Sequence, residues 1–194
     1  LVAPTAVAAR KGRVTGLDLW HPALCCCTAG SVVQGQATSL PFAGATFGLV
    51  AMLDVLEHVA DDVALLQEAR RVCRPGGAVL VLTSAFMFLW SDHDRANRHQ
   101  RRYTASELVR KANRAGLETR YASYHNTLLF PLALLVRLAQ RLRPPSGPPR
   151  IDMFPLPEPG NTLLARLLAW EGRLMRLGPL PVGVSLVALL ERPV

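Results

Sequence analysis

The chain has 194 residues, half of them hydrophobic, so it can bury the core of one domain and is too apolar for a disordered chain. Its formal net charge of +8 is compatible with an acidic partner, but no run of lysine and arginine is as long as a nucleic-acid-binding tail, and we expect no nucleic-acid partner. No stretch approaches the roughly 18 apolar residues of a transmembrane helix, and the four cysteines form no paired zinc motif, which favours a cytoplasmic location.

The first half of the chain alternates short apolar runs with helical patterns. In chain order the pattern predicts a strand at 13–18, a helix at 20–29, strands at 31–35 and 46–53, a helix from Asp61 or Asp62 to Val72, and a strand at 78–83. Pro75-Gly76-Gly77 is expected to end that last helix. Because the run at 46–53 is apolar without interruption, we expect a strand covered on both faces.

The second half continues the alternation of strands and helices as far as residue 125, after which arginine-studded helical patterns and a proline-rich segment follow. It predicts a capping box at 104–107, a helix at 105–115, a strand at 117–125, a helix at 128–143, a proline-rich segment at 143–160 without regular structure, a helix at 161–177 and a strand at 182–190. Such alternation of strands and helices is typical of an α/β sheet with crossover helices.

Three sequence patterns follow one another at sensible spacings: Val14 to Asp18, Gly35 to Phe42, and the pair Leu53 to Val59 with Arg71 to Gly77. Together they resemble class I S-adenosylmethionine-dependent methyltransferases. The resemblance implies one α/β domain over residues 1–194: a Rossmann-like, mostly parallel sheet with flanking helices, an antiparallel last strand, and a helical, proline-rich insertion at 126–182.

The resemblance also implies a cofactor site for S-adenosylmethionine. Asp18 would hold the ribose, and residues near it and at the next strand ends would complete the site; these are Leu19, Gln36 and Ala37 by the adenine, and Leu53 and Asp54 by the methionine part. From the residues alone, Asp18 could equally cap the helix that follows it. Gln36 stands where the family usually has an acid, so we expect weaker adenine recognition.

The family's first strand and glycine-rich turn are not recognisable at the start of the sequence. Residues 1–12 contain a single glycine, Gly12, and 6–12 read as the tail of a helix. Because that strand lies in the middle of the family's sheet, we expect an N-terminally incomplete domain with a hole in its core. The alternative to an enzyme is therefore a non-catalytic remnant or binding domain. A nicotinamide-dependent oxidoreductase would share an acid after the second strand, but would not account for the Glu57-His58 turn.

Two histidines are candidate catalytic bases. His58 follows Asp54 and Glu57 on the turn into a helix, and its ordinary pKa near neutrality suits proton transfer. In ubiquinone-type methyltransferases a similar pattern binds a divalent metal, but no metal is assigned here. Helix capping is the simpler interpretation of Glu57. His93 lies in a polar loop at 90–103 that could be an acceptor lid, or a solvated loop held by Asp–Arg pairs.

The arginine-studded helices expected at 128–143 and 163–177 allow two interpretations. They could contact an anionic membrane surface or a long lipid acceptor, which would make the protein membrane-peripheral. They could instead pack on the domain with their arginines snorkelling to solvent, which is the interpretation that we favour. The sequence as a whole predicts methyl transfer to an unidentified small-molecule or lipid acceptor.

Overall fold

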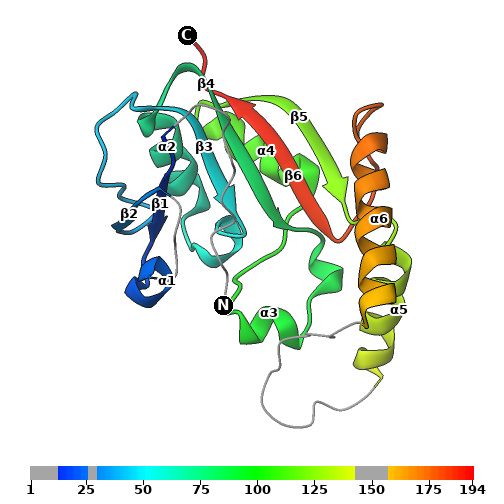
Figure 1. The fold of residues 1–194 in the computed structure, drawn as a ribbon. Helices are drawn as coiled ribbons and strands as arrows, with labels where there is room; N and C mark the ends of the chain where they lie inside the picture. The colour runs from blue at the N-terminus through cyan, green and yellow to red at the C-terminus, as the bar shows by residue number, and fades with distance from the viewer. Residues whose placement is uncertain (1–12, 26–29, 143–156) are drawn as a thin grey trace.

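The structure, a computed structural model, describes residues 13–25, 30–142 and 157–194. Two sheets form its frame (Figure 1). A parallel pair joins β1 (Thr15–Asp18) to β2 (Ser31–Gln34), with α1 (His21–Cys25) between them. The second sheet has the order β3-β4-β6-β5. Its strands are β3 (Phe47–Leu53), β4 (Cys73–Ser84), β5 (Glu118–His125) and β6 (Ser185–Glu191).

The α/β class and the antiparallel last strand are confirmed, and two details differ. β3 is parallel to β4, whereas β6 pairs antiparallel with both β4 and β5 and lies between them. The expected single sheet is instead two sheets within the described residues. A cavity of about 170 Å³ lies between them, lined by β1 residues such as Leu17 and β3 residues such as Val50.

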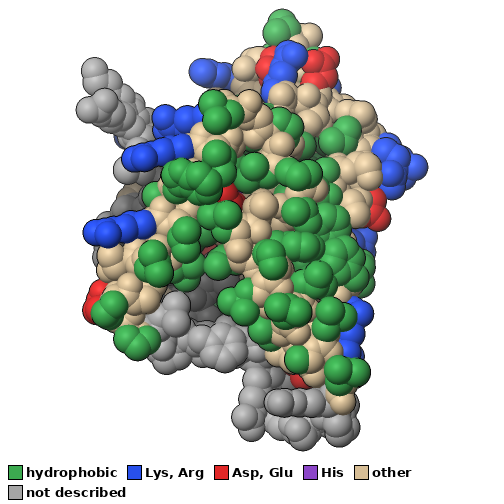
Figure 2. All heavy atoms as spheres, turned by 90° about the vertical axis from the view of Figure 1, so that its right-hand side faces the viewer, with side chains coloured by type: hydrophobic (Ala, Val, Ile, Leu, Met, Phe, Trp, Pro, Cys, Tyr) green, Lys and Arg blue, Asp and Glu red, His purple; other side chains and the backbone are tan. Residues whose placement is uncertain are grey.

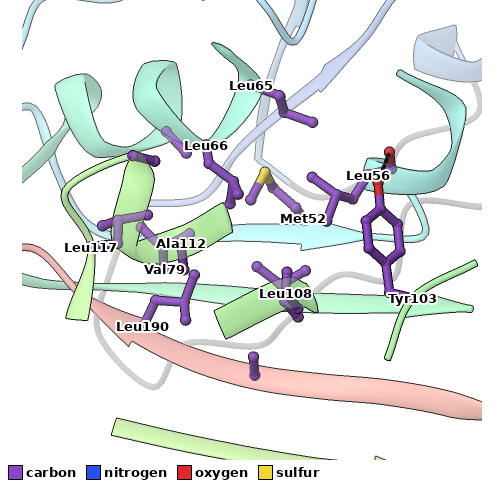
Figure 3. Close-up of a cluster of buried hydrophobic side chains, with 14 of the residues drawn as sticks. Met52, Leu56, Leu65, Leu66, Val79, Tyr103, Leu108, Ala112, Leu117 and Leu190 are labelled. Atoms are coloured by element: carbon purple, nitrogen blue, oxygen red, sulfur yellow. Dashed lines mark hydrogen bonds between the residues drawn. The ribbon is translucent and has the colours of Figure 1, made fainter. Parts of the chain in front are cut away.

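Two helices cover one face of the four-stranded sheet. They are α2 (Asp62–Val72) and α4 (Ala105–Arg114), and they contact each other as well as β4 and β5. Their apolar sides meet the inward side chains of the strands in one core (Figure 3); it includes Met52, Leu56, Leu65, Leu66, Val79, Leu108, Ala112, Leu117 and Leu190. Burying such side chains is worth about 1.5–3 kcal/mol each.

The opposite face of this sheet is only partly covered. Along β6, the side chains at 186, 188 and 190 are buried, while Leu189 between them is 38% exposed. Leu49 on β3 is exposed as well. The prediction that 46–53 forms a strand covered on both faces was therefore wrong, because in the described part of the chain α2 and α4 cover one face and Leu49 on the other face is exposed.

The remaining elements lie around the ends of the strands. Short turns of helix occur at η1 (Leu56–His58), η2 (Met87–Leu89) and α3 (Asp92–Ala96). The helices α5 (Phe130–Arg141) and α6 (Glu158–Leu174) stand together beside β5 and β6 (Figure 1). The proline-rich part of the expected insertion, 143–156, lies outside the described residues. No helix in the described residues has the length and hydropathy needed to cross a membrane.

Several helices and strands begin or end at other residues than predicted. α6 begins at Glu158, inside the segment expected to lack structure, because Pro159 occupies its first turn, where a missing N–H costs nothing. Pro75 and both glycines after it lie within β4, which starts directly after α2. The expected helix at 20–29 is described only as far as Cys25.

Candidate functional site

The carboxyl ends of three strands carry backbone strain. Asp54 follows β3 with φ of 52°, Phe86 follows β4 with φ of 58°, and Asn126 follows β5 with φ of 60°. Non-glycine residues in this left-handed region cost about 1–3 kcal/mol each and cluster at functional sites. In Figure 1, β1 leads down into α1 and β3 also points downward, so their carboxyl ends lie on the same side of the molecule.

Asp18 ends β1 and is half-buried. One carboxylate oxygen accepts a hydrogen bond of 2.7 Å from the backbone N–H of Trp20, a local turn contact that lies before α1 and does not cap it. The other oxygen accepts no hydrogen bond from the described part of the chain. Leu19 is exposed, and its carbonyl accepts from the amide of Gln34 at 3.0 Å. At the end of a strand, this second carboxylate oxygen of Asp18 can accept a hydrogen bond from a ligand hydroxyl.

Gln36 and Ala37 lie in a tight turn after β2. The Gln36 carbonyl accepts from the N–H of Ser39 at 3.1 Å, and its side chain is exposed. Ala37 packs against the core and lines the cavity between the sheets. Leu40 and Phe42, which the resemblance offers as apolar neighbours of the adenine, line this cavity too, whereas Asp18, Gln36 and Asp54 are not on its lining.

Glu57 anchors the turn after β3 to β4. Its fully buried carboxylate accepts from the hydroxyl of Thr83 at 2.8 Å, and from both the N–H and hydroxyl of Ser84, at 3.2 and 3.1 Å. The expectation that Glu57 caps the start of a helix was therefore wrong, because its partners belong to β4. Burial, with the nearby charge of Glu57, raises the pKa of Asp54.

Both candidate histidines lie near a third histidine, His99. The ring centroids of His58 and His99 are 4.6 Å apart at nearly a right angle, and those of His93 and His99 are 6.3 Å apart. Nδ1 of His99 lies 2.9 Å from Oδ1 of the fully buried Asp94. Because a carboxylate only accepts, Nδ1 of His99 carries a proton and donates it to Asp94.

Asp94 is held ionised by its surroundings. Burial alone would raise the pKa of its carboxyl, but hydrogen bonds from His99 and Arg102 outweigh it and hold the pKa well below its ordinary value. Arg102 makes two of these bonds, at 2.8 and 3.0 Å. His58 differs: burial, followed by the nearby His99, lowers its pKa below 6.5.

The loop at 90–103 is held by ion pairs, and the pair of Asp94 with Arg102 is buried. Arg102 is bound to Asp94, and Arg101 donates to Asp62 at 2.9 Å and to the carbonyl of Ala60. If the loop were an acceptor lid, Arg101 and Arg102 would be its candidates to hold an anionic acceptor; Arg102 is buried in its ion pair, whereas Arg101 keeps 33% of its side chain exposed. Asp–Arg pairs do hold this loop, as one of our two interpretations has it, but Asp94 and Arg102 are buried in the protein and not solvated.

The pairing of His99 with Asp94 was not predicted from the sequence. Their pairing depends on α3 turning the chain back on itself between them, and the spacing Asp94-x-x-x-x-His99 is the only local signal. Within residues 13–25, 30–142 and 157–194, no group of three or more histidine, cysteine, aspartate or glutamate side chains is arranged to hold a metal ion.

Comparison with known proteins gives a consistent result. Residues 2–81 match the profile of a family described as a methyltransferase domain. The chain superimposes on an S-adenosylmethionine-dependent methyltransferase from Mesorhizobium loti with a TM-score of 0.57 and 14% identity, covering 93% of this chain and 80% of that one. The [4+2]-cyclase SpnF matches with a TM-score of 0.56 and 16% identity, over 94% of this chain and 67% of that one. These likenesses show the fold alone.

The curated relatives are similar over shorter stretches. A demethylmenaquinone methyltransferase from Mycobacterium sp. (strain KMS) is 49% identical over 49 residues, 25% of this chain and 21% of that protein. A ubiquinone/menaquinone biosynthesis C-methyltransferase from Legionella pneumophila (strain Corby) is 46% identical over 50 residues, 26% of this chain and 20% of that protein. The matches thus span about a fifth of these relatives' lengths.

Proposed function

We propose that this chain, which carries a methyltransferase domain and the class I fold, binds S-adenosylmethionine and positions it for methyl transfer to a small-molecule or lipid acceptor. The observation that carries the proposal is the placement of Asp18 and Asp54. They end two strands whose carboxyl ends lie on the same side of the molecule. Ligands of open α/β sheets bind outside those ends.

The cofactor side of the site would use the residues around β1 and β3. The available oxygen of Asp18 suits a ribose hydroxyl, with Leu19 beside it; Gln36 and Ala37 suit the adenine, and Leu53 and Asp54 suit the methionine part. S-adenosylmethionine supplies a methyl carbon activated by a positive sulfonium. The task left to the protein is to align donor and acceptor and to exclude water.

The acceptor side would use the histidines. His58 and His93 are our candidate bases, and His99, oriented by Asp94, lies beside both. A neutral imidazole can take the proton of an acidic hydroxyl or ring carbon as the acceptor is methylated. The two named relatives act on demethylmenaquinone or in ubiquinone and menaquinone biosynthesis, which supports a quinone-like ring as the first acceptor class to test.

Isothermal titration calorimetry tests the cofactor site. Purified protein should release or absorb heat on titration with S-adenosylmethionine and S-adenosylhomocysteine. Asp18→Asn should weaken both by about tenfold or more, because a charged acceptor is lost. Glu118→Gln, an exposed acid at the start of β5, is the control and should bind as the wild type does. No heat from the wild-type protein rejects the proposal, and unchanged affinity in Asp18→Asn rejects the role of Asp18.

Turnover with a reduced demethylmenaquinone tests the acceptor side. His58→Ala and His93→Ala should each lower the rate of S-adenosylhomocysteine formation while leaving cofactor affinity near the wild-type value. If a variant loses affinity and not rate, that histidine belongs to the cofactor site. If neither quantity changes in either variant, the histidines have no catalytic role.

One observation favours a second candidate, a binding domain without catalysis. Within the described residues, β1 and β3 are not paired, and an apolar cavity separates them. A protein that kept this fold without cofactor binding would give no heat in the calorimetry above, so the same experiment separates the two candidates.

A further inference from the structure

The helices α5 and α6 present an apolar surface to solvent. No residue of α5 is buried. The exposed hydrophobic residues of this pair, which we call the α5–α6 face, are Leu132, Leu135, Leu138 and Leu142 on or next to α5, and Leu163, Leu167, Trp170 and Leu177 on or next to α6. Figure 2 views this side of the molecule and shows hydrophobic side chains gathered across it. Contiguous patches of this kind mark interaction sites.

α6 is fixed with its apolar side outward. Leu163, Leu167 and Trp170 follow one another at intervals of four and three residues, which is the spacing that a helix normally buries against a core. Glu171, in contrast, is fully buried, and its carboxylate accepts from the N–H of Leu128 at 3.1 Å.

A second contact holds the end of α6. The hydroxyl of Tyr121 on β5 donates to the carbonyl of Met175 at 2.9 Å, directly after the last residue of the helix. These polar contacts hold α6, and Leu163, Leu167 and Trp170 face outward, whereas its other leucines are half-buried.

The charge around the face is positive. α5 carries Arg137 and Arg141 and no acid, and α6 carries Arg166 and Arg173, each three residues from a member of the apolar stripe. The acids of α6 are the buried Glu171 and the terminal Glu158. The whole chain has a formal net charge of +8. Leucine and tryptophan flanked by arginine is the composition of helices that lie in the interface of an anionic bilayer.

We propose that the α5–α6 face binds the surface of an anionic lipid bilayer. The face is also connected to the candidate site, because α5 begins at Phe130, whose ring centroid lies 6.1 Å from that of Phe86 and 6.3 Å from that of Phe88. Arg141 donates to the carbonyl of Phe88 at 2.6 Å. Membrane docking would thus set the residues that follow β4 beside the lipid surface. The proposal stands whether or not the methyltransferase activity does.

Vesicle cosedimentation tests the proposal. Purified protein is spun with vesicles of phosphatidylcholine alone, or with phosphatidylglycerol added at roughly one part in four. Binding should require the anionic lipid and should weaken several-fold as salt rises from about 0.1 M to about 0.5 M. Leu132→Ser with Leu135→Ser should reduce the partition coefficient at least about tenfold. The control is Leu19→Ser, whose side chain is 64% exposed, like Leu132 (63%) and Leu135 (65%), but lies beside β1.

Single-tryptophan variants give an independent readout. Trp170 is 50% exposed and Trp20 is 58% exposed. A protein that keeps only Trp170 should shift its emission to the blue on adding anionic vesicles, and one that keeps only Trp20 should not. A shift in Trp20 alone overturns the proposal.

Two further results would also overturn it. One is wild-type binding that equals the binding of the double leucine variant. The other is a dimer, seen by light scattering, that this variant turns into a monomer without affecting vesicle binding; the face would then join two copies of the chain. Thermal unfolding by circular dichroism verifies that each variant is folded, and changes at exposed leucines should leave Tm nearly unchanged.

Discussion

At the scale of single residues, the best-supported contacts are buried charges near the candidate site. Asp94 is fully buried and takes hydrogen bonds from Arg102, His99 and Ser91. Asp62 is buried in the same way beside Tyr103 and Lys111. Burying a charge is unfavourable unless partners satisfy it. These networks therefore favour the observed conformation of the loop at 90–103, because other conformations would leave buried charges unpaired.

Removing the charge of Asp94 should therefore destabilise the protein. Asp94→Asn leaves Arg102 buried without its counterion, and we expect the free energy of unfolding to fall by about 3–5 kcal/mol. Urea denaturation measures the change. Asp92→Asn is the matched control, because Asp92 forms a pair with Arg95 at 3.2 Å in which both side chains are more than half exposed, and it should cost less than about 1 kcal/mol. An equal fall in the free energy of unfolding in both variants would show that burial does not determine how much each ion pair contributes to stability.

His58 should make stability depend on pH just below neutrality. Burial lowers its pKa in the folded state, so the unfolded chain binds more protons as the pH falls through the ordinary histidine value. Stability is therefore lost as the pH falls from about 7 toward about 5. In His58→Gln this loss should be smaller than in the wild type, as measured by Tm at each pH. The same loss in both proteins would mean that His58 is not the source.

At the scale of elements, the close approach of backbones positions β6. A Cβ on Gly183, which precedes β6, would lie 2.2 Å from the carbonyl oxygen of His125 at the end of β5. Such a distance is impossible without moving one strand. Gly172 in α6 is the opposite case, since a Cβ there would meet nothing within 4 Å.

Replacing Gly183 and Gly172 with alanine should thus change the free energy of unfolding in opposite directions. Gly183→Ala should lower the free energy of unfolding by several kcal/mol, because the β5–β6 junction has to shift. Gly172→Ala should raise it by about 0.5–1 kcal/mol, because alanine has the higher helix propensity. Chemical denaturation of both variants checks the pair. A neutral Gly183→Ala would place the strand ends further apart than the structure does.

Local signals in the sequence predicted most elements but not the short helices of the site. Asp61 caps α2, and Thr104 with Glu107 forms the capping box of α4, as predicted, because caps depend on residues three apart. η1 is held instead by the bonds of Glu57 to Thr83, 26 positions away. The burial of Arg102 could not be predicted from the sequence either, because it depends on the contact with Asp94 in the folded structure. The strand ends could be placed from the sequence; the contact between the histidines could not.

At the scale of the whole molecule, hydrogen bonding between strands is uneven. β4 pairs with β3 on one side and β6 on the other, whereas each strand of the β1–β2 sheet has one partner among the described residues. The two sheets are separated by the cavity described above. Cooperative units with few buried contacts open at lower free energy than a core does.

Hydrogen exchange should therefore divide the molecule in two. Backbone amides around Val79 and Val81 in β4, paired on both sides, should exchange slowest, and those of β1 and β2 should exchange by a separate, faster opening. Mass spectrometry of peptides from each strand measures both rates. If β1–β2 is as protected as β4, the two sheets unfold as one unit. Adding S-adenosylmethionine, if Asp18 binds it, should slow exchange in β1.

The left-handed residues after β3, β4 and β5 have a consequence for how this protein could change over generations. Glycine at Asp54 or Asn126 would relieve the backbone and raise thermal tolerance, yet each replacement would delete a polar side chain at the same rim. Variants selected for heat resistance alone should therefore acquire glycine at these positions, whereas variants selected for turnover should keep Asp54 and Asn126.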